Sequence, residues 1–133
     1  MWYIFDNSNS VGKKGSEGGI ILSDFESSNG ARITIEQNGN IAPFSVTIGI
    51  YNLMFHTYFC SSQEEAISFR EQTIEKIDDI FKLLEVDNEN RNEEWDINFH
   101  NKIEEICKKH HFNHRRNLRF AICSSWCVWG TRL

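Results

Sequence analysis

Long apolar runs are missing from this chain of 133 residues. No stretch approaches the roughly 20 apolar residues that a helix needs to cross a bilayer. The first residues lack the basic region and the small-residue cleavage site of a secretory signal, and no Asn-x-Ser/Thr glycosylation site is present. The four cysteines are unevenly placed, which favours a reducing compartment. We therefore predict a cytoplasmic protein without a membrane partner.

The chain also lacks recognisable catalytic and nucleotide-binding motifs. The glycines between Gly12 and Gly19 fit neither phosphate-loop pattern, so we interpret residues 7–19 as a mobile loop. Cys60 precedes a predicted helix, but His56 lies four residues earlier on the same predicted strand, about 13 Å away and too far for a nucleophile–base pair. We interpret Cys60 as a buried structural thiol and predict no enzymatic activity.

Charge is unevenly distributed along the sequence. Residues 64–107 hold fourteen acidic and five basic residues, net −9, whereas residues 1–63 are net −2 and residues 108–119 are net +5. A chain with an overall charge of −5 repels nucleic acid, so we do not expect a nucleic-acid partner. The acidic stretch favours a basic protein partner instead.

The hydrophobic period changes once, near residue 61. Before that point apolar residues alternate, as in residues 31–35 and 46–50, and after it they recur every three or four positions. We expect five strands, near residues 2–5, 18–22, 31–36, 44–50 and 54–60, and two helices, at about 62–84 and 92–112. The sequence thus predicts a single α+β domain over residues 1–133, with an antiparallel sheet of about five strands in residues 1–60 and both amphipathic helices on one face.

The end of the chain, residues 117–133, is an apolar segment whose structure the pattern does not decide. It would form a returning strand, dock on the core, or dock on another chain. Trp126 and Trp129 left in water would make an unusual apolar patch, so a homodimer through this segment is one expectation.

Two surfaces of the predicted fold are candidates for partner binding. The outer ridge of the first helix carries Glu71, Glu75, Asp78 and Asp79. Like charges four residues apart cost a few tenths of a kcal/mol, so the ridge is either a solvated helix face or an acidic docking surface. The second surface is the polar face of the sheet. If Ile33, Ile48, Phe55 and Phe59 set the core side, that face holds Arg32, Thr34, Glu36, Thr47, His56 and Tyr58.

We expect from these features a small, acidic, non-enzymatic protein-binding module. Bacterial immunity and antitoxin proteins share this size and charge, an analogy that rests on those two properties alone. No family is identified by its motifs.

The alternative is a zinc-stabilised or thiol-redox protein that uses Cys107, His110, Cys123 and Cys127. Zinc takes four N or S ligands, and residues three apart on a helix reach a common point. However, the segment has no tight Cys-x2-Cys knuckle, and a buried cysteine often acts as a small hydrophobic residue.

Overall fold

The computed structural model describes the backbone of residues 1–112 and the side chains of residues 1–107. Five strands form one antiparallel sheet in chain order: β1 (Trp2–Ile4), β2 (Ile20–Ser27), β3 (Ala31–Gln37), β4 (Phe44–Ile50) and β5 (Met54–Cys60). The remaining elements are the single turns η1 (Phe5–Ser8) and η2 (Asn88–Asn90) and the helices α1 (Gln63–Leu84) and α2 (Glu93–Phe112). The predicted α+β class is confirmed, while the predicted C-terminal segment lies outside the described residues.

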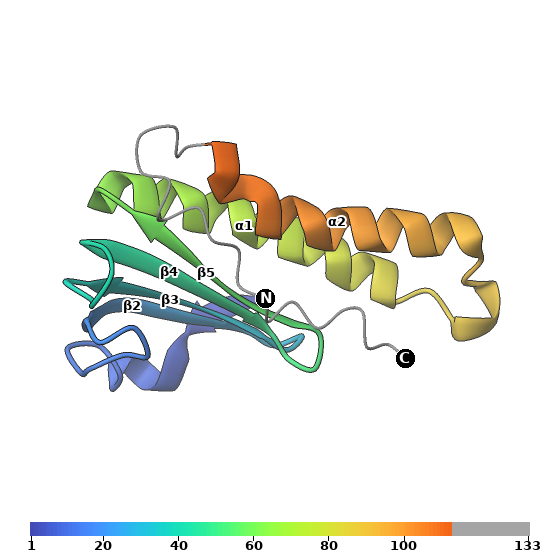
Figure 1. Ribbon diagram of the computed structural model, residues 1–133. Coiled ribbons are helices and arrows are strands. Elements are labelled where there is room, and N and C mark those ends of the chain that lie inside the picture. Colours follow the sequence, from blue (N-terminus) through green and yellow to red (C-terminus); the bar gives the residue numbers. More distant parts are fainter. Residues whose placement is uncertain (113–133) are drawn as a thin grey trace.

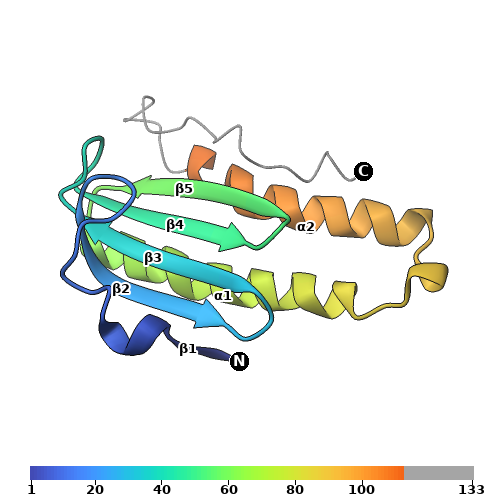
Figure 2. The same ribbon diagram turned by 90° about the horizontal axis from the view of Figure 1, so that it is seen from below.

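Both helices lie on the same face of the sheet (Figure 1). Helix α1 crosses β3 and β4, and α2 runs beside α1 and contacts β5. The other face, which we call the open face, carries no helix from the described part of the chain. Figure 2 looks onto the open face, where the segment from η1 to β2 curls over one end of the sheet. As far as residues 1–112 are concerned, the open face is therefore where the sheet remains accessible.

The apolar core fills the space between the sheet and the helices. Ile33 and Ile48 from the sheet meet Ile77 and Ile80 from α1, and each is 0% exposed. Burying one such side chain contributes about 1.5–3 kcal/mol to folding. Because the strands alternate, the same pattern that supplies this core places their polar residues on the open face.

Helix α1 begins at a capping box. Ser62 is the N-cap, and its Oγ accepts a hydrogen bond from the Glu65 amide at 3.1 Å. The Glu65 carboxylate accepts in return from the Ser61 amide at 3.0 Å. These bonds satisfy amide groups that the first turn leaves without partners, which explains why the helix starts directly after β5.

The predicted orientation of β5 was wrong. Ile50 pairs with Met54 across a three-residue turn, and directly paired residues project to the same side of an antiparallel sheet. Strand β5 therefore turns Met54, His56, Tyr58 and Cys60 toward the helices and Phe55, Thr57 and Phe59 toward the open face. His56 is 0% exposed and Tyr58 is 1% exposed. These two residues belong to the core and not to an accessible contact patch.

Candidate functional site

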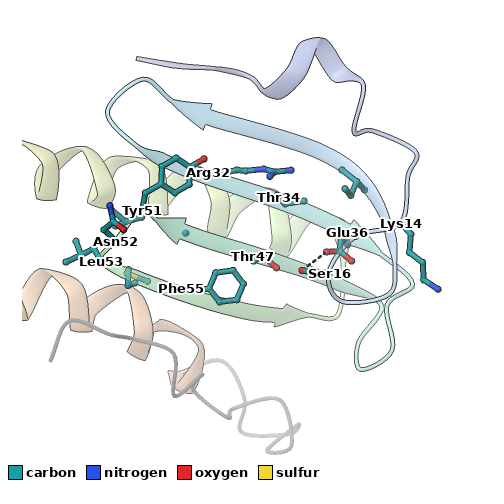
Figure 3. A pocket seen from close by; sticks show the side chains of 15 residues that line it. Lys14, Ser16, Arg32, Thr34, Glu36, Thr47, Tyr51, Asn52, Leu53 and Phe55 are labelled. Carbon is teal, nitrogen blue, oxygen red and sulfur yellow. Dashed lines mark hydrogen bonds between the residues drawn. The ribbon is translucent and has the colours of Figure 1, made fainter. Parts of the chain in front are cut away.

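A groove of about 830 Å³ hollows the open face of the sheet. Its floor is formed by β3, β4 and β5. Residues 14–16 of the loop before β2 form one end, and residues 51–53 of the turn between β4 and β5 form the other (Figure 3). This volume lies in the range of small-molecule binding sites, about 300–1,000 Å³. The groove is therefore large enough to be a ligand site.

One row of three residues crosses the floor of the groove. Arg32 on β3, Gly49 on β4 and Phe55 on β5 are direct neighbours in the sheet register. The Arg32 side chain is 36% exposed and Phe55 is 43% exposed. Gly49 leaves the middle of the row bare, and a Cβ built there would meet the Phe55 ring at 3.8 Å, an ordinary contact. The row thus presents a cation and an aromatic ring on either side of a hollow.

Arg32 is held in place by Asp24 on β2. Its Nε and Nη2 donate to the two carboxylate oxygens of Asp24 at 2.8 and 2.6 Å. Ser10 and Thr34 donate their hydroxyls to the same carboxylate at 2.8 and 3.0 Å, and the Phe5 ring stacks 3.7 Å from the guanidinium carbon of Arg32. Burial acts to raise the pKa of Asp24, but the hydrogen bonds from Arg32 and the two hydroxyls outweigh it and hold the pKa below the usual 3.8. Asp24 is therefore ionised and fully hydrogen-bonded.

Glu36 on β3 organises the loop at the other end of the groove. The Glu36 residue is 1% exposed, and its carboxylate accepts from the amides of Glu17 and Gly19 at 3.1 Å each and from the Ser16 hydroxyl at 3.5 Å. Gly15 packs directly on this carboxylate, so no side chain would fit there. The segment that we predicted to be a mobile loop is tied to the sheet by these bonds. In a phosphate-binding loop the backbone amides bind a ligand. Here the amides of the loop bind the Glu36 carboxylate of the same chain.

Glu26 on β2 anchors residues 51–53, the turn that forms one end of the groove. It accepts hydrogen bonds from the hydroxyls of Tyr3 at 2.9 Å and Tyr51 at 2.7 Å. The bonds from Tyr51 and Tyr3 lower the pKa of Glu26, and burial together with the bond to Glu26 raises the pKa of Tyr51 to about 12. Tyr51 thus ties the turn between β4 and β5 to β2, two strands away on the same face of the sheet.

The sequence analysis found only part of this site. Arg32 and Glu36, with Thr34 and Thr47, were predicted to share one face and do line the groove together. Asp24 and Glu26 were missed because β2 was predicted to end at residue 22, whereas it runs to Ser27. The alternation of acidic residues with serine and phenylalanine over residues 23–27 was the signal that would have extended the strand.

Three of the four predicted ridge residues are exposed on α1. Glu75 is exposed, Glu71 is 60% exposed although it pairs with Arg70 at 2.8 Å, and Asp79 is 49% exposed with Lys102 at 4.0 Å. The pair of Asp79 with Lys102 joins two partly solvated side chains and contributes about 0–1 kcal/mol, whereas Arg70 is only 14% exposed beside the solvated Glu71. The ridge carboxylates are therefore available to a partner at little cost to the fold.

Asp78, the fourth ridge residue, differs from the other three. It is half-buried, and its carboxylate accepts a hydrogen bond from the indole of Trp2 at 2.9 Å. Because Trp2 lies in β1, this bond joins α1 to the edge of the sheet. We therefore assign Asp78 a structural role and exclude it from the acidic surface.

The predicted metal site lies mostly beyond the described side chains. Cys107 is buried at 6% exposure on α2, whereas His110, Cys123 and Cys127 lie outside the side chains that the structure describes. Within residues 1–107, no group of three His, Cys, Asp or Glu side chains is placed to hold a metal ion. Zinc binding by this cluster stays a prediction.

Cys60 lies in the core at the end of β5. It is 0% exposed, and burial, with a smaller contribution from the Glu65 carboxylate, raises the pKa of its thiol. A thiol in this environment stays protonated, whereas the thiolate is the nucleophile. The surroundings favour a structural role for Cys60.

The described helices were also compared with membrane-spanning segments, and the whole chain with known proteins. Between residues 1 and 112, no helix has the length and apolar character needed to cross a membrane. No protein-family model, curated protein or solved structure matches the chain. Function must therefore be inferred from the two surfaces described above, the groove of the open face and the acidic side of α1.

Proposed function

We propose that this protein is a non-enzymatic binding module that recognises a basic protein partner with the outer side of α1. The observation that carries the proposal is the exposed row of Glu71, Glu75 and Asp79 on one side of the helix. These carboxylates are four residues apart, and their mutual repulsion works against helix stability. A negative surface of this kind attracts a basic partner and raises the rate of association.

The net charge of the helical part of the chain also supports a basic partner. The helical part of the chain, residues 64–107, is net −9. The five basic residues of this stretch balance only five of its fourteen acidic ones. An immunity- or antitoxin-like role, in which the partner is a basic toxin, is one form of this function and is suggested by size and charge alone.

Capture followed by reconstitution tests the proposal. The protein is immobilised, captured proteins from the native source are identified, and each is purified for binding measurements. The triple variant Glu71→Lys, Glu75→Lys, Asp79→Lys is then compared with the unaltered chain. We expect at least about a tenfold loss of affinity, or 1.4 kcal/mol, mostly from slower association, with a weaker dependence on salt.

A matched variant separates the ridge from net charge. Glu85→Lys, Asp87→Lys, Glu89→Lys makes the same change in charge on exposed positions between the two helices. Its affinity should stay close to that of the unaltered chain. Equal losses in both variants would show that the partner senses only total charge, and the absence of any loss in the ridge variant would refute the proposed surface.

A further inference from the structure

The hydrogen bonds of the groove determine which charge a ligand should carry. Asp24 accepts from four donors and Glu36 from three, and both residues are at most 1% exposed. A carboxylate offers about four acceptor positions, so the protein saturates Asp24, and it fills three positions of Glu36 while burying that residue. Neither is free to bind a cationic ligand directly.

At the floor of the groove, unused donor capacity belongs to Arg32, and at the loop end the exposed Lys14 is a second cation of the lining. A guanidinium carries five N–H donors, and Arg32 uses Nε and Nη2 to hold Asp24. Its Nη1 makes no hydrogen bond within the described residues, and the side chain is 36% exposed where it lines the groove. Asp24 fixes the guanidinium in one orientation before any ligand arrives. A group held in this way loses little entropy on binding.

The other half of the groove is apolar. Phe55 stands on the far side of the bare Gly49, and Leu53 continues the apolar lining in the adjoining turn (Figure 3). Adjacent strands are about 4.8 Å apart, so the backbone of Arg32 and that of Phe55 are separated by roughly 10 Å. A ligand that spans this row has a polar end at Arg32 and a body about as long as a substituted phenyl ring.

We propose that the groove binds a small-molecule carboxylate with an apolar, aromatic body. The ligand carboxylate accepts hydrogen bonds from Nη1 of Arg32, and the body lies over Gly49 against the Phe55 ring. This site is on the opposite side of the sheet from α1 and is independent of the proposed basic partner.

Three probes of equal shape test the charge assignment. Phenylbutyrate, phenylbutanol and phenylbutylammonium share one body and differ in the end group. Their dissociation constants are measured by NMR titration, with the shifts mapped onto Arg32, Gly49 and Phe55. A hydrogen bond between charged groups is stronger than one between neutral groups, so we expect the carboxylate to bind at least about tenfold more tightly than either of the others.

Filling the hollow tests the position. Gly49 does not have a positive φ, and a Cβ there makes only an ordinary contact, so Gly49→Val fits the strand. The variant should bind phenylbutyrate at least about tenfold more weakly, since the valine occupies the place of the ligand body. Ser68→Val, on the exposed side of α1, adds bulk away from the groove and should bind as the unaltered chain does. Amide spectra of both variants report whether the fold is kept.

Four outcomes would overturn the inference. None of the probes binds, the shifts map outside the groove, the ammonium or alcohol probe binds as tightly as the carboxylate, or a folded Gly49→Val keeps its affinity for phenylbutyrate. If Gly49→Val does not fold, the order of the three probes and their mapped shifts on the unaltered chain decide the question by themselves.

Discussion

The sheet and the helices use their carboxylates in opposite ways. On the open face of the sheet, Asp24, Glu26 and Glu36 each accept hydrogen bonds from other parts of the same chain. On the outer side of α1, Glu71 and Glu75 are exposed to water, and among the side chains of residues 1–107 Glu71 pairs with the neighbouring Arg70. A buried charge must be compensated by donors, whereas a solvated charge contributes little to folding.

This difference separates residues that build the molecule from residues that are free to recognise another one. The sheet carboxylates fix a loop, a turn and an arginine, and so they shape the groove. The ridge carboxylates of α1 fix nothing comparable. Substitutions in the two regions should therefore have different consequences, large effects on stability in the sheet and small ones in the helix.

The largest effect is expected for Asp24→Asn. The substitution leaves the Arg32 guanidinium without its charged partner, and the amide keeps only one of the two oxygens that accept from the hydroxyls of Ser10 and Thr34. Breaking one side of a buried ion pair costs about 3–5 kcal/mol, and because Arg32 is partly exposed we expect about 3 kcal/mol at neutral pH. Urea unfolding measures this free energy.

Glu75→Gln is the matched substitution in the helix. It also replaces an acid by its amide, at an exposed position, and should change the free energy of unfolding by less than about 0.5 kcal/mol. Similar losses in both variants would mean that the two regions do not differ in the way described.

Glu36→Gln should have the next largest effect, about 2 kcal/mol. The amide keeps the shape of the side chain but has one acceptor oxygen, so one of the loop donors is left without a partner. Hydrogen exchange at the amides of Glu17 and Gly19 should become faster, while exchange in the core strands follows only the global loss of stability. Unchanged protection of these two amides would show that Glu36 does not hold the loop.

The free energy of unfolding should also depend on pH through the ionisation of Asp24. Its pKa is lower in the folded chain than the usual 3.8, so the unfolded chain takes up a proton first as the pH falls. The stability that Asp24 contributes is therefore fully present above pH 3.8 and is lost as the pH drops through the lower, folded value. The gap between the unaltered chain and Asp24→Asn should be constant from neutral pH to about 5 and should narrow in more acidic solution. Unfolding curves over this range test it, and a gap that widens would contradict the assigned direction.

The sequence was sufficient to predict the architecture because the signals for it are local. The change of hydrophobic period near residue 61 and the Ser62–Glu65 capping box both depend on neighbours along the chain. The site was harder to predict. The pairing of Asp24 with Arg32 and of Glu26 with Tyr51 depends on which strands become neighbours. Polar pairs of this kind produce no periodic hydrophobic pattern in the sequence from which they could be predicted.

The error in β5 has a different origin. His56 and Tyr58 are polar enough to suggest an exposed face, and Phe55 and Phe59 apolar enough to suggest the core. The register is instead set by the three-residue turn that pairs Ile50 with Met54. The predicted strands 44–50 and 54–60 already leave a three-residue turn between them. Pairing Ile50 with Met54 across this turn places His56 and Tyr58 on the core face.

The smallest and most discriminating effect is expected for Glu75→Lys. The lysine turns two repulsive contacts, with Glu71 and with Asp79, into attractive ones, and the pair with Glu71 has the favourable order of acid before base. Stability should rise by about 0.5 kcal/mol, less at high salt, while affinity for a basic partner falls. Thermal or urea unfolding at two salt concentrations measures the first effect, and binding of the reconstituted partner measures the second. A loss of stability would reveal a structural role for Glu75, and the ridge would then resemble the carboxylates of the sheet. A gain in stability together with weaker binding would show that the repulsion is kept in the chain for recognition, at the expense of the fold.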